Sequence, residues 1–182
     1  MGTAGSITLV FDAVLPIATT LDAPVSLAVT GGTDVAWAPT LGYYRHVKLP
    51  LLRDVGVDAH VTLARRGFYP AGGGRATLHV ESAGEIQPLD LTSRGELARV
   101  SIRSTAARAL SDAEVAERQA TEAIDQLPRD VPSTRYVTYV ESDSPGSVVD
   151  LVAEYAHSRA GFSALGERGK PAESVARDAV DA

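Results

Sequence analysis

Three consecutive glycines, Gly72 to Gly74, stand between two segments in which apolar residues alternate with other residues, 57–63 and 76–80. Alternation with a period of two is typical of half-buried strands, so the sequence predicts two strands joined by a glycine-rich hairpin. Glycines can also present backbone N–H groups to a phosphate. The chain, however, has neither the Gly-x-x-x-x-Gly-Lys pattern nor a Gly-x-Gly-x-x-Gly that opens a helix. We therefore favour a hairpin whose glycines allow a close backbone approach.

The segment before this hairpin alternates between helical and strand patterns. An apolar stripe with helical spacing covers residues 7–18, with Pro16 as a kink or late break, and residues 25–29 alternate as a strand. Pro39 opens a second helical stretch, which Pro50 must distort. The order helix, strand, helix, strand, strand predicts an α/β fold. A strand normally precedes the first helix of such a unit, so we expect Met1 to be an unnatural beginning.

A second module is expected from about Arg94, after a polar link over residues 81–93. The sequence predicts a strand over 97–103, a helix opened by a Ser111–Glu114 capping box and stopped by Pro128, and strands over 136–140 and 148–155. The link 142–147 turns the chain between the last two strands. A final helix begins at Pro171, and the chain stops soon afterwards, so we also expect truncation at the C-terminus.

The composition excludes several kinds of chemistry. The 182 residues include no cysteine, which excludes disulfides, thiolate metal sites and a cysteine nucleophile. Without a secretion signal or a long apolar segment, we expect a soluble, cytoplasmic protein. The net charge of -6 and the presence of only two lysines favour a halophilic, haloarchaeal source, and they are weak evidence against nucleic-acid binding.

Possible functional residues are few. Gly31-Gly32-Thr33-Asp34 followed by Pro39 lies between a strand and a helix, where α/β folds place ligands, although a plain turn explains it equally well. No histidine lies in a nucleophile motif or has metal-ligand spacing; the four are His46, His60, His79 and His157. His60 and His79 fall on the polar side of their strands. Arg65 and Arg66 can meet RNA phosphate or form ordinary salt bridges.

Five runs give the chain a resemblance to a known family. They are Gly5 to Val10, Gly31 to Asp34, Arg66 to Gly74, Val115 to Arg118, and Gly166 to Pro171. In this order they resemble RNA 3'-terminal phosphate cyclases, and the third and fifth runs are the most specific. The resemblance covers nearly the whole chain.

The resemblance implies a fold of repeated βαβαββ units, similar to the C-terminal domain of initiation factor 3, with a smaller inserted α/β domain. We expect residues 1–92 to be an incomplete part of the large domain, 93–165 the inserted domain, and 166–182 a return toward the large domain. Family members are considerably longer. The resemblance implies that a metal-binding glutamate and the catalytic histidine lie in N- and C-terminal segments that are not in this sequence.

The implied activity is ATP-dependent, belongs to the ligase class and uses a divalent metal, Mg or Mn. A histidine attacks the α-phosphate of ATP and releases pyrophosphate; AMP then passes to an RNA 3'-phosphate. The neighbouring 2'-hydroxyl closes a 2',3'-cyclic phosphate and expels AMP. We expect this chain to be inactive without the two missing segments.

The nucleotide-binding residues implied by the resemblance are Gly31, Gly32, Thr33, Asp34, Pro39, Tyr43 and Asp12. Pro39 matches a proline expected to lie against adenine. Asp12 replaces a glutamine found in many cyclases, and an ionised aspartate can accept but cannot donate a hydrogen bond. Nucleotide contact by Asp12 therefore survives only if an acceptor suffices.

Two other functions remain open from the sequence. One is a non-catalytic relative of the cyclases that binds partners in ribosome assembly. The other is a different enzyme built on the same repeated unit, such as a carboxyvinyl transferase, which needs several basic residues around an anionic substrate. The family-specific runs argue against both.

Overall fold

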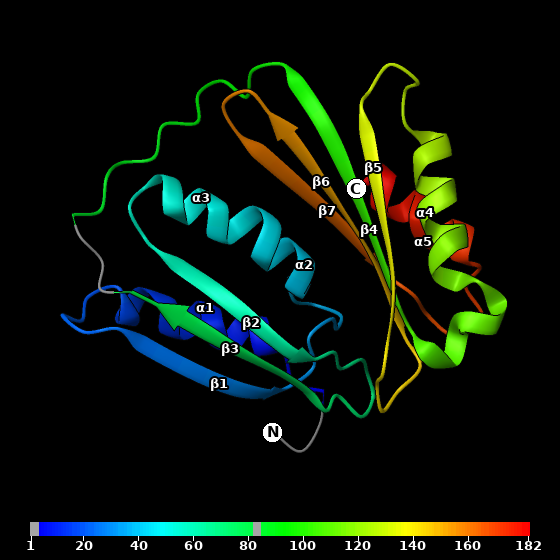
Figure 1. The fold of residues 1–182 in the computed structure, drawn as a ribbon, viewed down its shortest axis with the longest axis horizontal. Helices are drawn as coiled ribbons and strands as arrows, with labels where there is room; N and C mark the ends of the chain where they lie inside the picture. Colours follow the sequence, from blue (N-terminus) through cyan, green and yellow to red (C-terminus); the bar gives the residue numbers. More distant parts are fainter. Residues whose placement is uncertain (1–3, 82–84) are drawn as a thin grey trace.

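The computed structural model describes residues 4–81 and 85–182. They form two β-sheets, each covered by helices, which lie side by side (Figure 1). The first sheet has the strand order β1-β3-β2 and the second has the order β5-β4-β6-β7. The α/β class predicted from the sequence is therefore confirmed. Residues 82–84, within the predicted polar link, lie outside the described residues.

The first layer follows the predicted order of helix, strand, helix, strand, strand. Its elements are α1 (Ile7–Ala18), β1 (Val25–Gly31), α2 (Leu41–Tyr43), a π-helical turn η1 (Tyr44–Lys48), α3 (Leu49–Asp54), β2 (Ala59–Arg65) and β3 (Gly74–Val80). This order fits a βαβαββ unit without its first strand. Ser6 caps the N-terminus of helix α1, because its side chain accepts a hydrogen bond from the Leu9 N–H, and the helix ends two residues after Pro16.

The second helical stretch is distorted around Pro50, as its sequence predicts. The π-helical turn η1 separates α2 from α3, and Pro50 occupies the first turn of α3, where its missing N–H costs little. The wide turn itself has no sequence signal, and π-helical turns are often found at functional sites.

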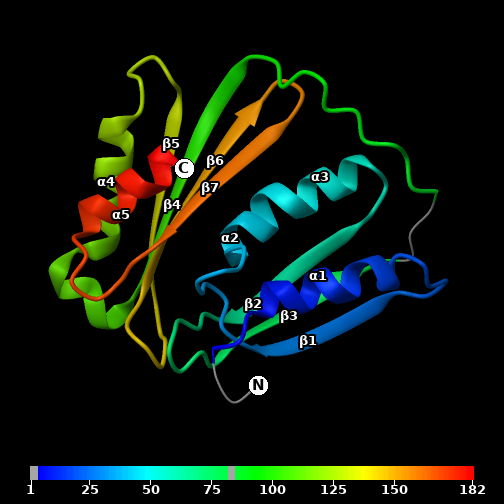
Figure 2. The ribbon, with the colours of Figure 1, turned by 180° about the vertical axis from the view of Figure 1, so that it is seen from behind.

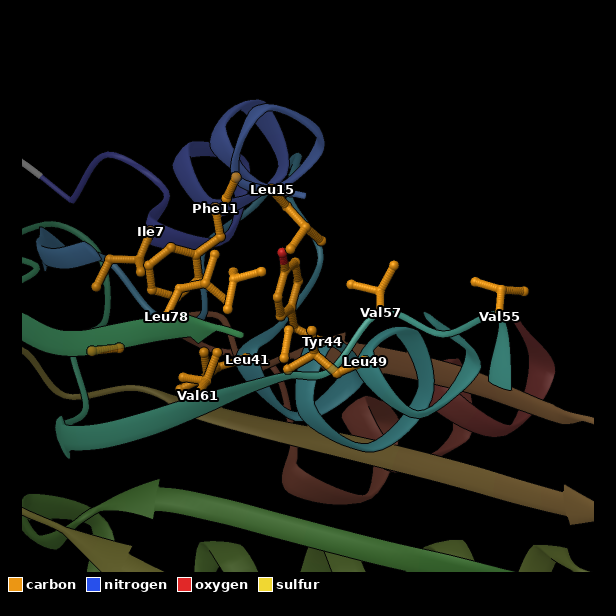
Figure 3. Close-up of a cluster of buried hydrophobic side chains, with 14 residues drawn as sticks. Ile7, Phe11, Leu15, Leu41, Tyr44, Leu49, Val55, Val57, Val61 and Leu78 are labelled. Carbon is orange, nitrogen blue, oxygen red and sulfur yellow. The ribbon is translucent and has the colours of Figure 1, made fainter. Parts of the chain in front are cut away.

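The glycine-rich run connects β2 and β3 as an antiparallel hairpin, which confirms that prediction. One face of the first sheet packs against α1 and against the α2–α3 segment (Figures 2 and 3). Tyr44 lies at the centre of this core, with its ring centroid 5.8 Å from that of Phe11. The opposite face carries His60 and His79, whose rings stack 4.6 Å apart, as expected for the polar side of these strands.

The second layer has four strands and two covering helices. Its elements are β4 (Leu97–Ala107), the 3-10 helix η2 (Arg108–Ala113), α4 (Val115–Gln126), β5 (Ser133–Val140), β6 (Ser147–Tyr155), β7 (Arg159–Leu165) and α5 (Ala172–Asp181). Strand β4 pairs in parallel with β5 and antiparallel with β6, so it lies between the two. Helices α4 and α5 cover one face together (Figure 2).

Two details of the second layer differ from the sequence predictions. The Ser111–Glu114 capping box is wrong: the Ser111 hydroxyl donates to the Arg108 carbonyl within η2, and α4 begins after Glu114, which has a left-handed φ of 49°. Strand β7 was not predicted. Its register with β6 is continuous from Val148–Leu165 to Glu154–Arg159.

The two layers meet at the glycine-rich hairpin. Phe68 packs with Ala107 and Val148 of the second layer in a small shared core. Helix α5 packs in the core of the second layer, where Val175 is buried. The three-part division at residues 92 and 165 stays a prediction. Within the described ranges, none of the helices is both long and apolar enough to cross a membrane.

Candidate functional site

The two glycines at the end of β1 hold the backbone close to the start of α1. The Gly32 N–H donates to the Gly5 carbonyl at 2.8 Å, and the Ile7 N–H donates to the Gly32 carbonyl at 2.9 Å. Gly31 pairs with Gly74 at the start of β3. Gly31 and Gly32 therefore fix where the following loop, residues 33–40, leaves the sheet.

Thr33 and Asp34 are buried and tie this loop to the glycine-rich run. The Asp34 carboxylate, 1% exposed, accepts from Arg66 Nη1 at 2.5 Å, from Thr33 Oγ1 at 2.6 Å and from the Leu41 N–H at 3.1 Å. Thr33 exchanges backbone and side-chain hydrogen bonds with Gly67. Burial lowers the pKa of Arg66, but the charge of Asp34, its hydrogen bond and the charge of Asp150 together outweigh burial, so the pKa is raised. Thr33 and Asp34 thus anchor the start of the loop 33–40, and their polar side-chain atoms are engaged in hydrogen bonds within the protein.

A second buried carboxylate, Asp150 of β6, joins the same loop to the other sheet. Its Oδ1 accepts from Thr40 Oγ1 and, at 2.8 Å, from Ser163 Oγ, and the carboxylate packs against Gly42. Burial, and then the nearby charge of Asp34, raise the pKa of Asp150 to about 6. Sequence reasoning missed this residue, although a charged side chain within the apolar run 148–152 is a signal for it.

A cavity of about 600 Å³ lies between the loop 33–40 and the second layer. Pro39 and Tyr43, both predicted from the sequence, line it. The other lining residues are Val35, Ala36, Trp37, Ala38, Thr40, Ser163, Ala164, Leu165, Glu167, Lys170 and Asp178. Its size is typical of small-molecule sites. One lysine against two acidic residues makes the lining suited to a neutral group rather than to a polyphosphate.

Trp37 at this cavity was not predicted from the sequence. Its side chain is 98% exposed and its φ is 64°, a left-handed conformation that is unusual for a large residue. Such strain is found most often at functional sites, and an exposed indole presents a face on which a planar ring can stack.

Asp12 is not among the residues that line the cavity. Its carboxylate, on α1, pairs with Lys48 Nζ of η1 at 2.5 Å. Burial first, and then Asp12, raise the pKa of the neighbouring Tyr44 hydroxyl. The nucleotide contact suggested for Asp12 stays a prediction.

The run Gly166 to Pro171 lines a second cavity of about 520 Å³, and its residues Glu167 and Lys170 line both cavities. Lys170 Nζ pairs with Asp178 of α5. The specific sequence run that follows β7 is therefore the shared wall between the two cavities.

The described residues do not form a metal site. Among residues 4–81 and 85–182, no three or more His, Asp or Glu side chains cluster as metal ligands would. They therefore do not by themselves fit the divalent metal that the resemblance implies. Likewise, His60, His79, His46 and His157 do not line either cavity.

The buried Asp150 predicts a specific pH dependence. Because its pKa is about 6 in the folded protein and ordinarily 3.8, the folded state holds more protons between these values. Stability should therefore fall as pH rises from about 4 to above 6, by on the order of 3 kcal/mol from this group. Asp150→Asn should flatten the profile of unfolding free energy measured in urea from pH 4 to 7. If unfolding free energy varies with pH in the same way in both proteins, Asp150 does not have the raised pKa of about 6.

The comparisons with known proteins agree with one family. A family model described as RNA 3'-terminal phosphate cyclase matches residues 1–179. An RNA 3'-terminal phosphate cyclase of Halobacterium salinarum is 52% identical over all of this chain and 52% of its own length. The cyclase of Hyperthermus butylicus is 41% identical over 100% of this chain and 52% of its own. The cyclase of Pyrococcus abyssi is 41% identical over 99% of this chain and 52% of its own length.

The chain thus spans about half the length of the curated relatives that it matches. The match extends through both layers and includes the loop 33–40, the glycine-rich hairpin and the shared wall of the two cavities. The chain belongs to the RNA 3'-terminal phosphate cyclase family.

Proposed function

We propose that this chain is part of an RNA 3'-terminal phosphate cyclase, which uses ATP to convert an RNA 3'-phosphate into a 2',3'-cyclic phosphate. In this proposal the chain supplies the adenosine part of the nucleotide site. The observation that carries the proposal is the 600 Å³ cavity, where the two predicted residues Pro39 and Tyr43 lie beside the exposed Trp37.

The residues of the chain bind and orient the nucleotide in this proposal. Pro39 and Tyr43 offer apolar surface to adenine, and Trp37 at the cavity lining offers an aromatic face. Gly31, Gly32, Thr33 and Asp34 act indirectly, because they set the position of the loop that carries Pro39. The buried Asp34–Arg66 pair and the Thr40–Asp150 hydrogen bond fix both ends of that loop.

The covalent steps require groups from outside this chain. We propose that a histidine attacks the α-phosphate of ATP with loss of pyrophosphate, and that AMP is then transferred to the RNA 3'-phosphate. Attack by the 2'-hydroxyl closes the cyclic phosphate and expels AMP. The family's divalent metal would assist the first step, with ligands from the remaining half of the longer relatives.

This division of labour predicts that the chain binds ATP without reacting with it. Incubation with α-labelled ATP and magnesium should leave no stable covalent AMP on the isolated chain, because the nucleophile is absent. A chimera that joins the chain to the flanking segments of the Halobacterium salinarum cyclase should form the adduct. It should also cyclise a 3'-phosphorylated oligoribonucleotide.

Two outcomes would count against the proposal. A stable adduct on the isolated chain would show that the nucleophile lies within these 182 residues. A folded chimera that binds ATP but cyclises no RNA would show that the chain does not serve a cyclase.

A further inference from the structure

Positively charged side chains gather where η1 faces the second sheet. Arg45 and His46 come from η1, Arg103 from β4 and Arg159 from β7. Arg159 Nη1 donates to the His46 carbonyl at 3.4 Å. A Cβ atom on Gly161 would lie 2.5 Å from Val47 Cγ2, so β7 runs directly against η1.

The charges are close enough to affect one another. Burial, followed by repulsion from Arg103, Arg45, Arg66 and Arg159, lowers the pKa of His46 to about 4. Burial, followed by repulsion from Arg66 and Arg103, also lowers the pKa of Arg45. The His46 imidazole is therefore neutral at pH 7 and is surrounded by positively charged guanidinium groups.

Within the described part of the chain, the three arginines of the cluster form no direct ion pair. Arg66 is neutralised by Asp34, but no carboxylate of residues 4–81 or 85–182 lies within 4.0 Å of the cationic nitrogens of Arg45, Arg103 or Arg159. The buried Arg103 Nε has no hydrogen-bond partner there. Some other arginines do form such pairs, namely Arg53, Arg65, Arg99, Arg108, Arg118 and Arg177, whereas Arg75, Arg94, Arg129, Arg135 and Arg168 form none within the described residues. Arg45, Arg103 and Arg159 differ from these five because they lie close enough to affect the same histidine. In a chain with net charge -6, leaving these three unpaired side by side points to an anion from outside.

An exposed aromatic ring extends the cluster along the sheet. Tyr136, Arg103, Asp150 and Ser163 lie opposite one another on β5, β4, β6 and β7. The Arg103 guanidinium carbon lies 4.2 Å from the centroid of the Tyr136 ring, which is 45% exposed as a residue. The ring holds the guanidinium in place and leaves aromatic surface free.

We propose that Arg45, Arg103 and Arg159, with Tyr136 beside them, bind the phosphodiester backbone of a single-stranded RNA. This inference rests on the proposed function, which supplies RNA as the substrate. Cations on three separate elements suit a strand that passes across them, and an exposed aromatic ring suits an unpaired base. Neither of the two cavities described above is lined by these arginines, so the cluster is separate from the adenosine site.

The test measures RNA binding by the chain in the absence of ATP. A fluorescein-labelled RNA 12-mer ending in a 3'-hydroxyl is titrated by anisotropy over a range of KCl concentrations in which circular dichroism shows a folded protein. Arg45→Gln and Arg103→Gln should each weaken binding at least threefold, and the double variant at least tenfold. The slope of log affinity against log salt should become shallower by about 0.7 for each RNA phosphate that the variant no longer neutralises.

A matched control lies on the far face of the first sheet. Arg75 is exposed on β3, and the neighbouring residues Gly74 and Ala76 are buried on the core side. Arg75→Gln should bind RNA within twofold of the unaltered chain. Equal losses in Arg75→Gln and Arg103→Gln would overturn the proposal, as would unchanged RNA binding in the double variant. So would equally tight competition by a glutamate-rich peptide of matched charge, which would indicate a protein partner.

A second measurement separates the cluster from a general effect on folding. The His46 ring is titrated by NMR in each variant. Arg103→Gln should raise the pKa of His46 toward its ordinary value, and Arg75→Gln should leave it unchanged. RNA binding by the unaltered chain should also raise it; no rise would count against phosphate at the cluster. Because these readouts need neither ATP nor cyclisation, failure of the chimera would leave them interpretable on their own.

Discussion

Replacement of Arg66 with methionine is expected to lower the free energy of unfolding by about 3–5 kcal/mol. The Arg66 side chain is 11% exposed and the Asp34 side chain is 0% exposed, so the substitution leaves a buried carboxylate without its cation. The loss should be measured by urea denaturation at neutral pH and constant KCl. The same variant should also lose ATP affinity. Asp34 lies at the start of the loop that carries Pro39, and its carboxylate accepts a hydrogen bond from the Leu41 N–H just after that loop.

The neighbouring Arg65 provides the control for this substitution. Arg65 pairs with Asp143 at 2.7 Å, but the two side chains are 41% and 48% exposed. Solvated pairs of this kind contribute at most about 1 kcal/mol, so Arg65→Met should change stability little. Similar losses in the two variants would contradict the distinction between the buried and the solvated pair.

Gly67→Ala is expected to be the most disruptive substitution in the glycine-rich run. A Cβ atom at this position would lie 2.3 Å from the Gly74 nitrogen and 2.4 Å from the Gly72 carbonyl oxygen. Both atoms belong to backbone that is fixed by the hairpin, so relief requires the hairpin itself to move. We expect a loss of about 3 kcal/mol in unfolding free energy, at the upper end for overpacking.

Gly169→Ala is the matched control for Gly67→Ala. Gly169 has a φ of 85°, and a Cβ atom there would meet nothing within 4 Å. Its substitution should cost about 1 kcal/mol, from the left-handed backbone alone. If the two alanine variants unfold at the same urea concentration, the glycines of the hairpin do not act through close backbone contact.

Local patterns in the sequence were sufficient to predict most elements of the fold. The helical stripe of α1, the alternation in β2 and β3, and the hairpin between them depend on neighbouring residues and were predicted correctly. Strand β7 was missed because the alternation of Ala160, Phe162 and Ala164 rests on residues that mostly have low strand propensity, and the segment becomes a strand through its pairing with β6. The Ser111 capping box failed because Ser111 bonds within η2 instead of to α4.

The site was predictable only in part, for a physical reason. Pro39 and Tyr43 are near one another in sequence and do line the same cavity. The buried partner of Thr40 is Asp150, 110 residues away, and no local pattern specifies a contact over that distance. The net charge of -6 is likewise a sum over the chain, and it does not show where arginines without counter-ions gather.

The central claim, that adenosine binds in the cavity beside the loop 33–40, can be tested through Trp37, the one tryptophan in the chain. Its emission, excited at 295 nm, reports on the cavity lining alone. ATP should quench this emission saturably, and Tyr43→Leu should weaken the apparent affinity at least tenfold, whereas Tyr136→Leu should leave it unchanged. Emission that does not respond to ATP, or an equal response in Tyr43→Leu and the unaltered chain, would contradict the account.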